Sequence, residues 1–186
     1  MSLPLIVLAI IVLALAWAII TYNRFVSLAT RIQEAWADID VQLKRRYDLI
    51  PNLIETVKGY AAHEAGTLEK VTEMRVKAMS ADTPAEKANA ENMLSSTLKS
   101  LFAVSENYPQ LKANENFLEL QRELSDTENK LQAARRFYNS VVQDLNAGIQ
   151  MFPASYVAAW GNFSAKEFFQ LSEADTAAKE PVKVSF

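Results

Sequence analysis

The chain has 186 residues, half of them apolar, with 4 Gly, 6 Pro and no Cys. Its formal net charge is -3, and Lys and Arg are scattered among Asp and Glu, so we expect no nucleic-acid partner. The lack of Cys excludes disulfides, thiolate nucleophiles and cysteine-ligated zinc. This length allows one helical domain with an appendage.

The N-terminal segment is typical of a membrane span. An uncharged apolar run begins at Leu3 and ends at Ile20, and Trp17 and Tyr22 fall where interfacial aromatic residues belong. About 18 helical residues cover roughly 27 Å of hydrocarbon. We therefore predict that residues 1–22 anchor the chain in lipid. The alternative is a cleaved signal peptide with a small-residue site at 14–16, but no Lys or Arg precedes the run, which is long for such a peptide.

The basic residues predict an orientation. Arg24 and Arg31 follow the run closely, whereas only the α-amine precedes it. The positive-inside rule then places the N-terminus outside and the remaining domain in the cytoplasm.

Beyond the run, the apolar residues recur at helical spacing. Pro51 interrupts this stretch without changing its phase, so we predict a kinked but continuous helix in which Pro51 offers no N–H to the Tyr47 carbonyl. The stripe consists of Leu28, Ile32, Trp36, Ile39, Leu43, Tyr47, Ile50, Ile54, Val57 and Ala61.

Two further helices are predicted before residue 110. The first has apolar residues at Leu68, Val71, Met74 and Met79. The second runs from Pro84 to about Asn107, because Thr83 and Glu86 occupy the positions of a capping box and Pro84 suits a first helical position.

The longest repeat begins at Asn114 and predicts a supercoiled helix. Its members stand seven residues apart at Phe117, Leu124, Leu131, Tyr138, Leu145 and Phe152. Strand signals are missing, so the expected fold is all-α: an antiparallel, four-helix-like bundle over 23–170 with a long first helix. Residues 171–186 are polar and alanine-rich, and we predict a flexible tail.

Several motifs in this order resemble the LemA family. They are Glu34-Ala35-Trp36, the run from Gln42 through Lys44-Arg45-Arg46-Tyr47 to Pro51-Asn52-Leu53, Glu106-Asn107-Tyr108-Pro109, Thr127-Glu128-Asn129 and Ala134-Arg135-Arg136-Phe137-Tyr138-Asn139. The resemblance implies a bacterial membrane protein with one N-terminal span, a helical bundle and no assigned enzymatic activity. It brings no catalytic or ligand residues with it. We expect the span to lie in the inner membrane.

The polar residues of these motifs admit two interpretations. They stand beside apolar seam positions and could pair with one another to fix the helical register. They could also form a contact surface for a protein partner, since the arginines lie on the order of 30 Å along a helix from the run, too far for lipid. The set is Arg45, Arg46, Asp48, Asn52, Glu106, Glu128, Asn129, Arg135 and Arg136.

The final aromatic segment is a candidate contact between copies of the chain. Its alternative is ordinary packing that closes the core. The residues are Tyr156, Trp160, Phe163, Phe168 and Phe169.

Motifs for catalysis are weak. His63 is the single histidine, and Ser96 with Lys99 makes an isolated Ser-x-x-Lys match without partner motifs. We therefore predict no cofactor, no metal and no small-molecule substrate. The leading hypothesis is a non-enzymatic scaffold or adaptor that self-associates at the membrane. The alternatives are a sensor or regulatory subunit that recruits a protein partner and, more remotely, a hydrolase or transferase.

Overall fold

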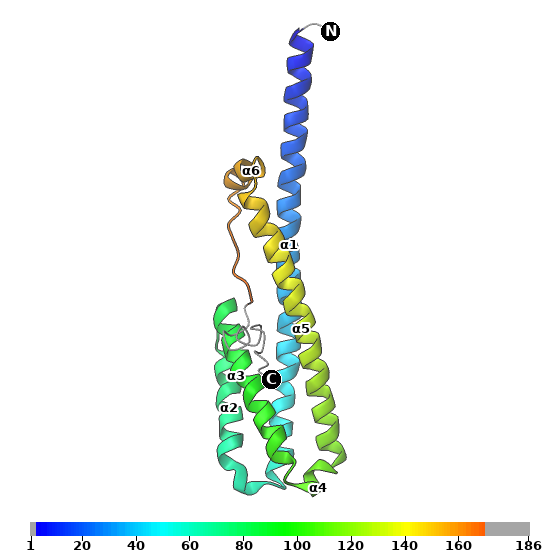
Figure 1. Ribbon diagram of the computed structural model, residues 1–186, viewed down its shortest axis with the longest axis vertical. Coiled ribbons are helices and arrows are strands. Elements are labelled where there is room, and N and C mark those ends of the chain that lie inside the picture. Colours follow the sequence, from blue (N-terminus) through cyan, green and yellow to red (C-terminus); the bar gives the residue numbers. More distant parts are fainter. Residues whose placement is uncertain (1–2, 170–186) are drawn as a thin grey trace, which may run out of the picture. The chain divides into compact units, whose positions relative to one another are not determined.

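A computed structural model describes residues 3–169 (Figure 1). The elements are α1 (Leu3–Lys58), the 3-10 turn η1 (Ala62–Glu64), α2 (Ala65–Met79), α3 (Pro84–Ser105), α4 (Pro109–Lys112), α5 (Glu115–Gln150) and α6 (Ala154–Trp160). No strand occurs within these residues, which confirms the all-α prediction. The predicted tail, residues 171–186, lies outside them.

The chain divides into two compact units. The anchor unit holds the described residues up to 38 together with 134–167, and the bundle unit holds 39–133 together with 168 and 169. Helices α1 and α5 each contribute to both units. The predicted boundary at residue 22 falls inside α1.

Helix α1 continues through Pro51 to Lys58, as the phase of its apolar stripe predicts. The Tyr47 carbonyl, which would receive the N–H missing from Pro51, instead accepts a hydrogen bond of 2.8 Å from Nε of Arg75 on α2. A donor from a neighbouring helix thus replaces the backbone donor. The predicted kink stays a prediction.

The N-terminal part of α1 is apolar and exposed. Among the described helices, α1 alone is long and apolar enough to cross a membrane, and none of its most apolar stretch is buried within the chain. Leu3 and Leu13 expose 76% and 69% of their surface. Such a surface fits a lipid environment.

Local signals set the starts of the later helices. The backbone N–H of Glu86 donates to Oγ1 of Thr83 at 3.2 Å, and the N–H of Thr83 donates to Oε2 of Glu86 at 3.3 Å, which confirms the capping box. At the start of α5, Oδ1 of Asn114 accepts from the N–H of Phe117 at 2.9 Å. Each side chain satisfies an amide that the first turn leaves free.

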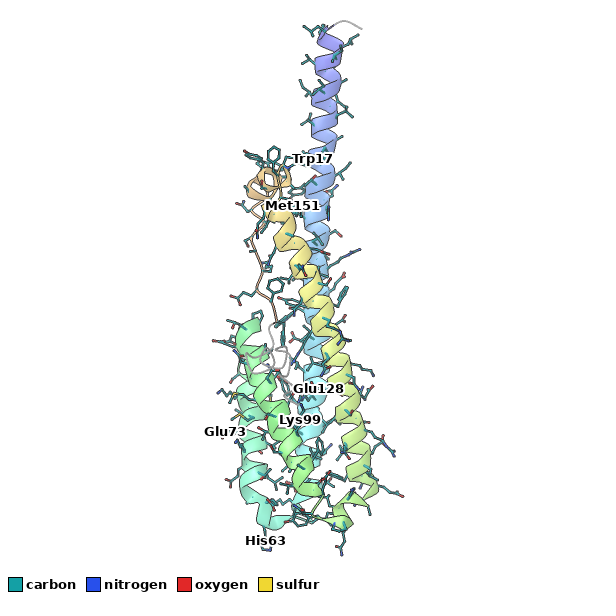
Figure 2. The ribbon with its side chains drawn as sticks, in the orientation of Figure 1. Trp17, His63, Glu73, Lys99, Glu128 and Met151 are labelled. Carbon is teal, nitrogen blue, oxygen red and sulfur yellow. The ribbon has the colours of Figure 1, made fainter. Side chains whose placement is uncertain are left out.

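The bundle unit contains four long helical segments, α1 from residue 39, α2, α3 and α5 as far as residue 133, and the short elements η1 and α4. Figure 1 shows α2 and α3 side by side, with the chain reversing between them. Two hydrogen bonds of 3.0 Å join the turn that follows α1 to the turns on either side of α4: the Tyr108 hydroxyl donates to Glu64, and the Asn114 amide donates to the Tyr60 hydroxyl. His63 lies in the same turn as Glu64 (Figure 2). Fully buried side chains include Ile39, Leu43, Ile50, Leu53, Leu94, Leu101, Leu111, Phe117 and Leu131.

The seven-residue repeat marks the buried face of α5 except at its end. Its first five members, Phe117, Leu124, Leu131, Tyr138 and Leu145, are buried. Phe152 is 81% exposed, so its assignment to the seam was wrong. The helix ends at Gln150 and the chain turns at Pro153, so the last member of the repeat lies outside the helix that would have turned it inward.

The anchor unit combines the first part of α1, the last part of α5, α6 and an extended segment that reaches Glu167. The rings of Trp36 on α1 and Tyr138 on α5 meet edge to face, with centroids 5.4 Å apart. The Tyr138 hydroxyl also donates to the Glu167 carbonyl at 3.0 Å. A Cβ at Gly148 would meet the ring of Phe25 at 3.0 Å, so the end of α5 lies close against α1.

Candidate functional site

A group of buried charged residues lies inside the bundle unit, around Arg46 on α1. Its Nη1 is 3.1 Å from Oε2 of Glu91 on α3 and 2.8 Å from Oε2 of Glu128 on α5. Its Nη2 donates to Oγ of Ser95 at 2.8 Å. Arg46 is 3% exposed and Glu91 is fully buried, whereas the Glu128 side chain is 30% exposed. One guanidinium therefore joins three helices.

Tyr47 completes this buried polar cluster. Its hydroxyl donates to Oε1 of Glu91, so both oxygens of that carboxylate have a donor. Burial raises the pKa of Tyr47, and the negative charge of Glu91 raises it further. Tyr47 therefore keeps its proton, and with it the hydrogen bond, throughout the neutral range.

The cluster's physical role follows from its burial. Removing one member of a buried ion pair leaves a charge without compensation, which costs about 3–5 kcal/mol. Ser95 links the remaining groups, since its hydroxyl also lies 3.4 Å from Oε2 of Glu128. These hydrogen bonds need one particular register of α1, α3 and α5, so the cluster fixes how the helices align.

The other predicted polar residues do not join this cluster. Arg45 faces Glu123 at 3.8 Å and Asp126 at 3.5 Å on the exposed side of α5, and Asp48 pairs with Lys44 one turn away at 2.9 Å. A hydrogen bond from Lys130 lowers the pKa of Asp126. Such exposed pairs contribute little to stability.

The remaining members of that predicted set are dispersed. Asn52, Glu106 and Asn129 are exposed in the bundle unit. Arg135 and Arg136 belong to the anchor unit, where Arg135 is buried and Arg136 is exposed. The set thus contributes Arg46 and Glu128 to the cluster, while Arg45 and Asp48 pair elsewhere.

Sequence reasoning missed Glu91, Ser95 and the polar role of Tyr47. A signal was present for Glu91, which lies three residues after Ala88 and three before Leu94, both buried. A glutamate in the apolar stripe of a helix needs a buried partner. Arg46 could have been proposed as that partner.

The predicted aromatic contact residues also separate. Phe163 is half-buried, with its ring 5.3 Å from that of Phe25 and 5.6 Å from that of Tyr22. Phe169 is buried in the bundle unit and Phe168 is half-buried there. Tyr156 and Trp160 on α6 are 72% and 80% exposed. Of the five predicted aromatic contact residues, only Tyr156 and Trp160 are therefore exposed enough to contact another molecule.

Residues of the weaker chemical motifs lie apart from the cluster. Ser96 and Lys99 are exposed on α3, and the only histidine, His63, lies in the turn η1. Across residues 3–169, no three His, Asp or Glu side chains gather as a metal site would require.

Sequence similarity relates most of the chain to one protein family. A sequence model of the LemA family matches residues 35–186, most of the chain. The chain belongs to the LemA family. The matched part begins after the apolar run and includes every member of the buried polar cluster.

Relatives of this LemA-family chain come from bacteria of different kinds. It is 29% identical over 155 residues to Protein LemA of Metamycoplasma hominis, which covers 81% of this chain and 69% of that protein. It is 23% identical over 186 residues to Magnetosome protein MamQ 2 of Paramagnetospirillum magneticum, covering 86% and 68%. It is 25% identical over 192 residues to Magnetosome protein MamQ of Magnetospirillum gryphiswaldense, covering 87% and 71%. None of these names is that of an enzyme, and together with the apolar start of α1 they indicate a membrane-associated protein.

Proposed function

We propose that this protein is a membrane-anchored, non-enzymatic scaffold or adaptor that self-associates at the membrane. The observation that carries the proposal is the closure of the buried polar cluster. Arg46, Glu91 and Tyr47 are engaged with one another and shielded from solvent, so they hold helices together and offer no reactive group to a substrate. We therefore expect contacts with partners to form on the exposed surfaces of the protein.

The apolar run of α1 supports both anchoring and self-association. Its large side chains are exposed around the whole helix, from Leu3 to Ile20. A span of this kind confines copies to two dimensions, and close side-chain packing between spans can hold them together. We place the run in the inner membrane of a bacterium, with the bundle unit in the cytoplasm, because Arg24 and Arg31 follow it.

The test is the mass of the full-length protein in lipid nanodiscs or mild detergent, measured by light scattering. The proposal predicts one discrete mass that is larger than that of a dimer of the 20.8 kDa chain. A chain beginning at Asn23 serves as the comparison, and it should have the mass of a monomer if the run drives assembly. A monomeric full-length protein would contradict self-association and leave a hetero-partner as the remaining role.

A second function is favoured by the continuity of α1. One helix carries both the apolar run and Arg46 of the buried cluster, as a sensor that relays a signal from the membrane would require. A sensor predicts dimers or a complex with another protein, whereas a scaffold predicts larger homo-oligomers. The same mass measurement separates the two.

A further inference from the structure

The segment between α5 and the extended chain has an unusual composition for a surface. No charged residue occurs between Asp144 and Lys166. The segment nevertheless exposes four large apolar or aromatic side chains by 61–81%: Met151, Phe152, Tyr156 and Trp160. Large exposed apolar surfaces on a folded domain mark a site where something other than water is in contact.

Two hydrogen bonds join the ends of this uncharged segment. The side-chain amide of Asn146 donates to the Lys166 carbonyl, and its Oδ1 accepts from the Lys166 N–H, both at 2.9 Å. Residues 147–165 therefore form a closed excursion from the body of the anchor unit.

The excursion rests on α1 at the end of the apolar run. The Trp160 ring meets Tyr22 edge to face, with centroids 5.8 Å apart. A Cβ at Gly161 would meet Phe163 at 2.5 Å and Tyr22 at 3.0 Å, so glycine is needed for this close approach. The position of α6 along α1 is thus determined by packing.

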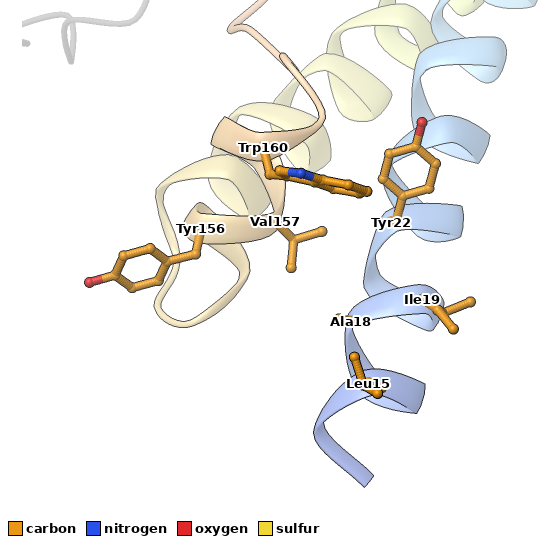
Figure 3. Close-up of a pocket in the computed structure, with 7 residues that line it drawn as sticks. All are labelled: Leu15, Ala18, Ile19, Tyr22, Tyr156, Val157 and Trp160. Atoms are coloured by element: carbon orange, nitrogen blue, oxygen red, sulfur yellow. The ribbon is translucent and has the colours of Figure 1, made fainter. Parts of the chain in front are cut away.

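A groove of about 620 Å³ lies between α6 and α1 (Figure 3). On the α1 side it is lined by Leu15, Ala18 and Ile19, which belong to the apolar run. On the α6 side it is lined by Val157 and the two exposed aromatic residues. Figure 3 shows the Trp160 ring turned toward Tyr22 and the Tyr156 ring turned away from α1.

We propose that the α6 excursion, residues 147–165, lies in the membrane–water interface beside α1 and forms a second contact with lipid, whose acyl chains occupy the groove. This inference rests on the membrane anchoring in the proposed function. Leu15 lies five residues before Ile20, or about 8 Å along α1. A groove that reaches this depth matches the roughly 5–10 Å by which interfacial helices enter the bilayer.

The composition of the excursion favours lipid over a second copy of the chain as its occupant. The groove continues the surface of the run itself, and Trp and Tyr are the side chains that concentrate at membrane interfaces. Because the excursion is uncharged, its contact with lipid should not depend on salt or on anionic headgroups.

The experiment uses the full-length chain in phosphatidylcholine vesicles with one tryptophan at a time. The double variant W17F/W36F leaves Trp160, and W36F/W160F leaves Trp17 within the run. A control reporter is F137W in a chain whose three tryptophans are Phe, since Phe137 is 51% exposed on α5 about 20 Å along that helix from its end. Circular dichroism checks that helix content is unchanged.

We expect phospholipids brominated just below the headgroup to quench Trp160 nearly as strongly as Trp17. Aqueous acrylamide should quench Trp160 at least about threefold less than the F137W reporter, because the bilayer excludes it. The same values should hold at high salt and with anionic lipid added.

Three results would overturn the inference, and they differ in what else they overturn. If Trp17 is quenched by the brominated lipid but Trp160 responds to acrylamide as F137W does, the interfacial contact is wrong and the anchor stands. If neither is quenched by the lipid, the membrane anchoring fails as well. If Trp160 is shielded from both quenchers and its shielding weakens as lipid dilutes the protein, a second copy covers the groove.

Discussion

The two units differ in where they place their polar and apolar side chains. The bundle unit buries Arg46, Glu91 and Tyr47 and joins them to one another. The anchor unit leaves Phe152 and Trp160 exposed on a segment without charge. A buried charge is tolerated where its partner is held nearby, and an exposed aromatic residue is tolerated where the solvent is not water. The first arrangement indicates a structural role and the second a contact surface.

The largest predicted effect comes from breaking the buried polar cluster. Arg46→Met removes the guanidinium that pairs with the buried Glu91 at 3.1 Å, so we expect a loss of about 3–5 kcal/mol in the free energy of unfolding. Urea denaturation followed by circular dichroism measures it. The matched control is Arg45→Met on the same helix, whose exposed pairs predict a loss of about 1 kcal/mol or less. Equal losses for the two variants would refute the structural role of the cluster.

Tyr47→Phe removes only the hydroxyl that donates to Glu91. A hydrogen bond to a charged group predicts a loss of about 1.5–3 kcal/mol, measured in the same denaturation experiment. No loss would mean that Glu91 is satisfied without Tyr47.

The same variant predicts a change in alkaline stability. The folded state holds the Tyr47 proton more tightly than the unfolded state, whose tyrosine pKa is near 10.0. Its stabilisation is complete below that pH and is lost as the pH rises toward the folded pKa. Stability should therefore fall above pH 10, and Tyr47→Phe should flatten part of that fall. Burial also raises the pKa of Tyr138, so some of the decline should persist.

The substitute donor at Pro51 predicts a coupling between two helices. Arg75→Met removes the hydrogen bond to the Tyr47 carbonyl and should cost about 1–2 kcal/mol, because the group is partly buried. In a Pro51→Ala background the backbone N–H returns, so the same change should cost less. A double-mutant cycle measures the difference, and a coupling of zero would show that the two donors do not substitute for each other.

The smallest predicted effect concerns the base of the α6 excursion. Asn146→Ala removes two exposed hydrogen bonds to Lys166 and should cost about 1 kcal/mol or less in global stability. Amide hydrogen exchange between residues 147 and 165 should nevertheless increase. Unchanged exchange in that segment would show that its packing on α1 suffices.

Much of the fold follows from local sequence signals. The capping box at Thr83, the phase of the stripe across Pro51 and the repeat along α5 each depend on residues within a few turns of one another. They predicted the starts of α3 and α5 and the buried faces correctly. Phe152 shows the limit, because a repeat does not say where its helix ends.

The candidate site was harder to predict, since its contacts join distant parts of the chain. Arg46 and Glu91 are separated by 45 positions, and their pairing depends on the register of α1 against α3. A helical period assigns a residue to a face but does not choose its partner on another helix. The hydrogen bonds between Asn146 and Lys166 were equally hard to predict, because they depend on how the chain turns at α6.

In the proposed function, the protein works through assembly at the membrane and not through its buried polar cluster. The most direct test labels full-length chains at a single Cys introduced at Asp82, which is possible because the chain has none of its own, and measures energy transfer between copies in vesicles. We predict that transfer persists when lipid is increased about tenfold, in the wild type and in Tyr47→Phe alike, because specific contacts resist dilution whereas random proximity in two dimensions does not. Transfer that falls to the level of random proximity in the wild type, or that is lost only in Tyr47→Phe, would contradict the account.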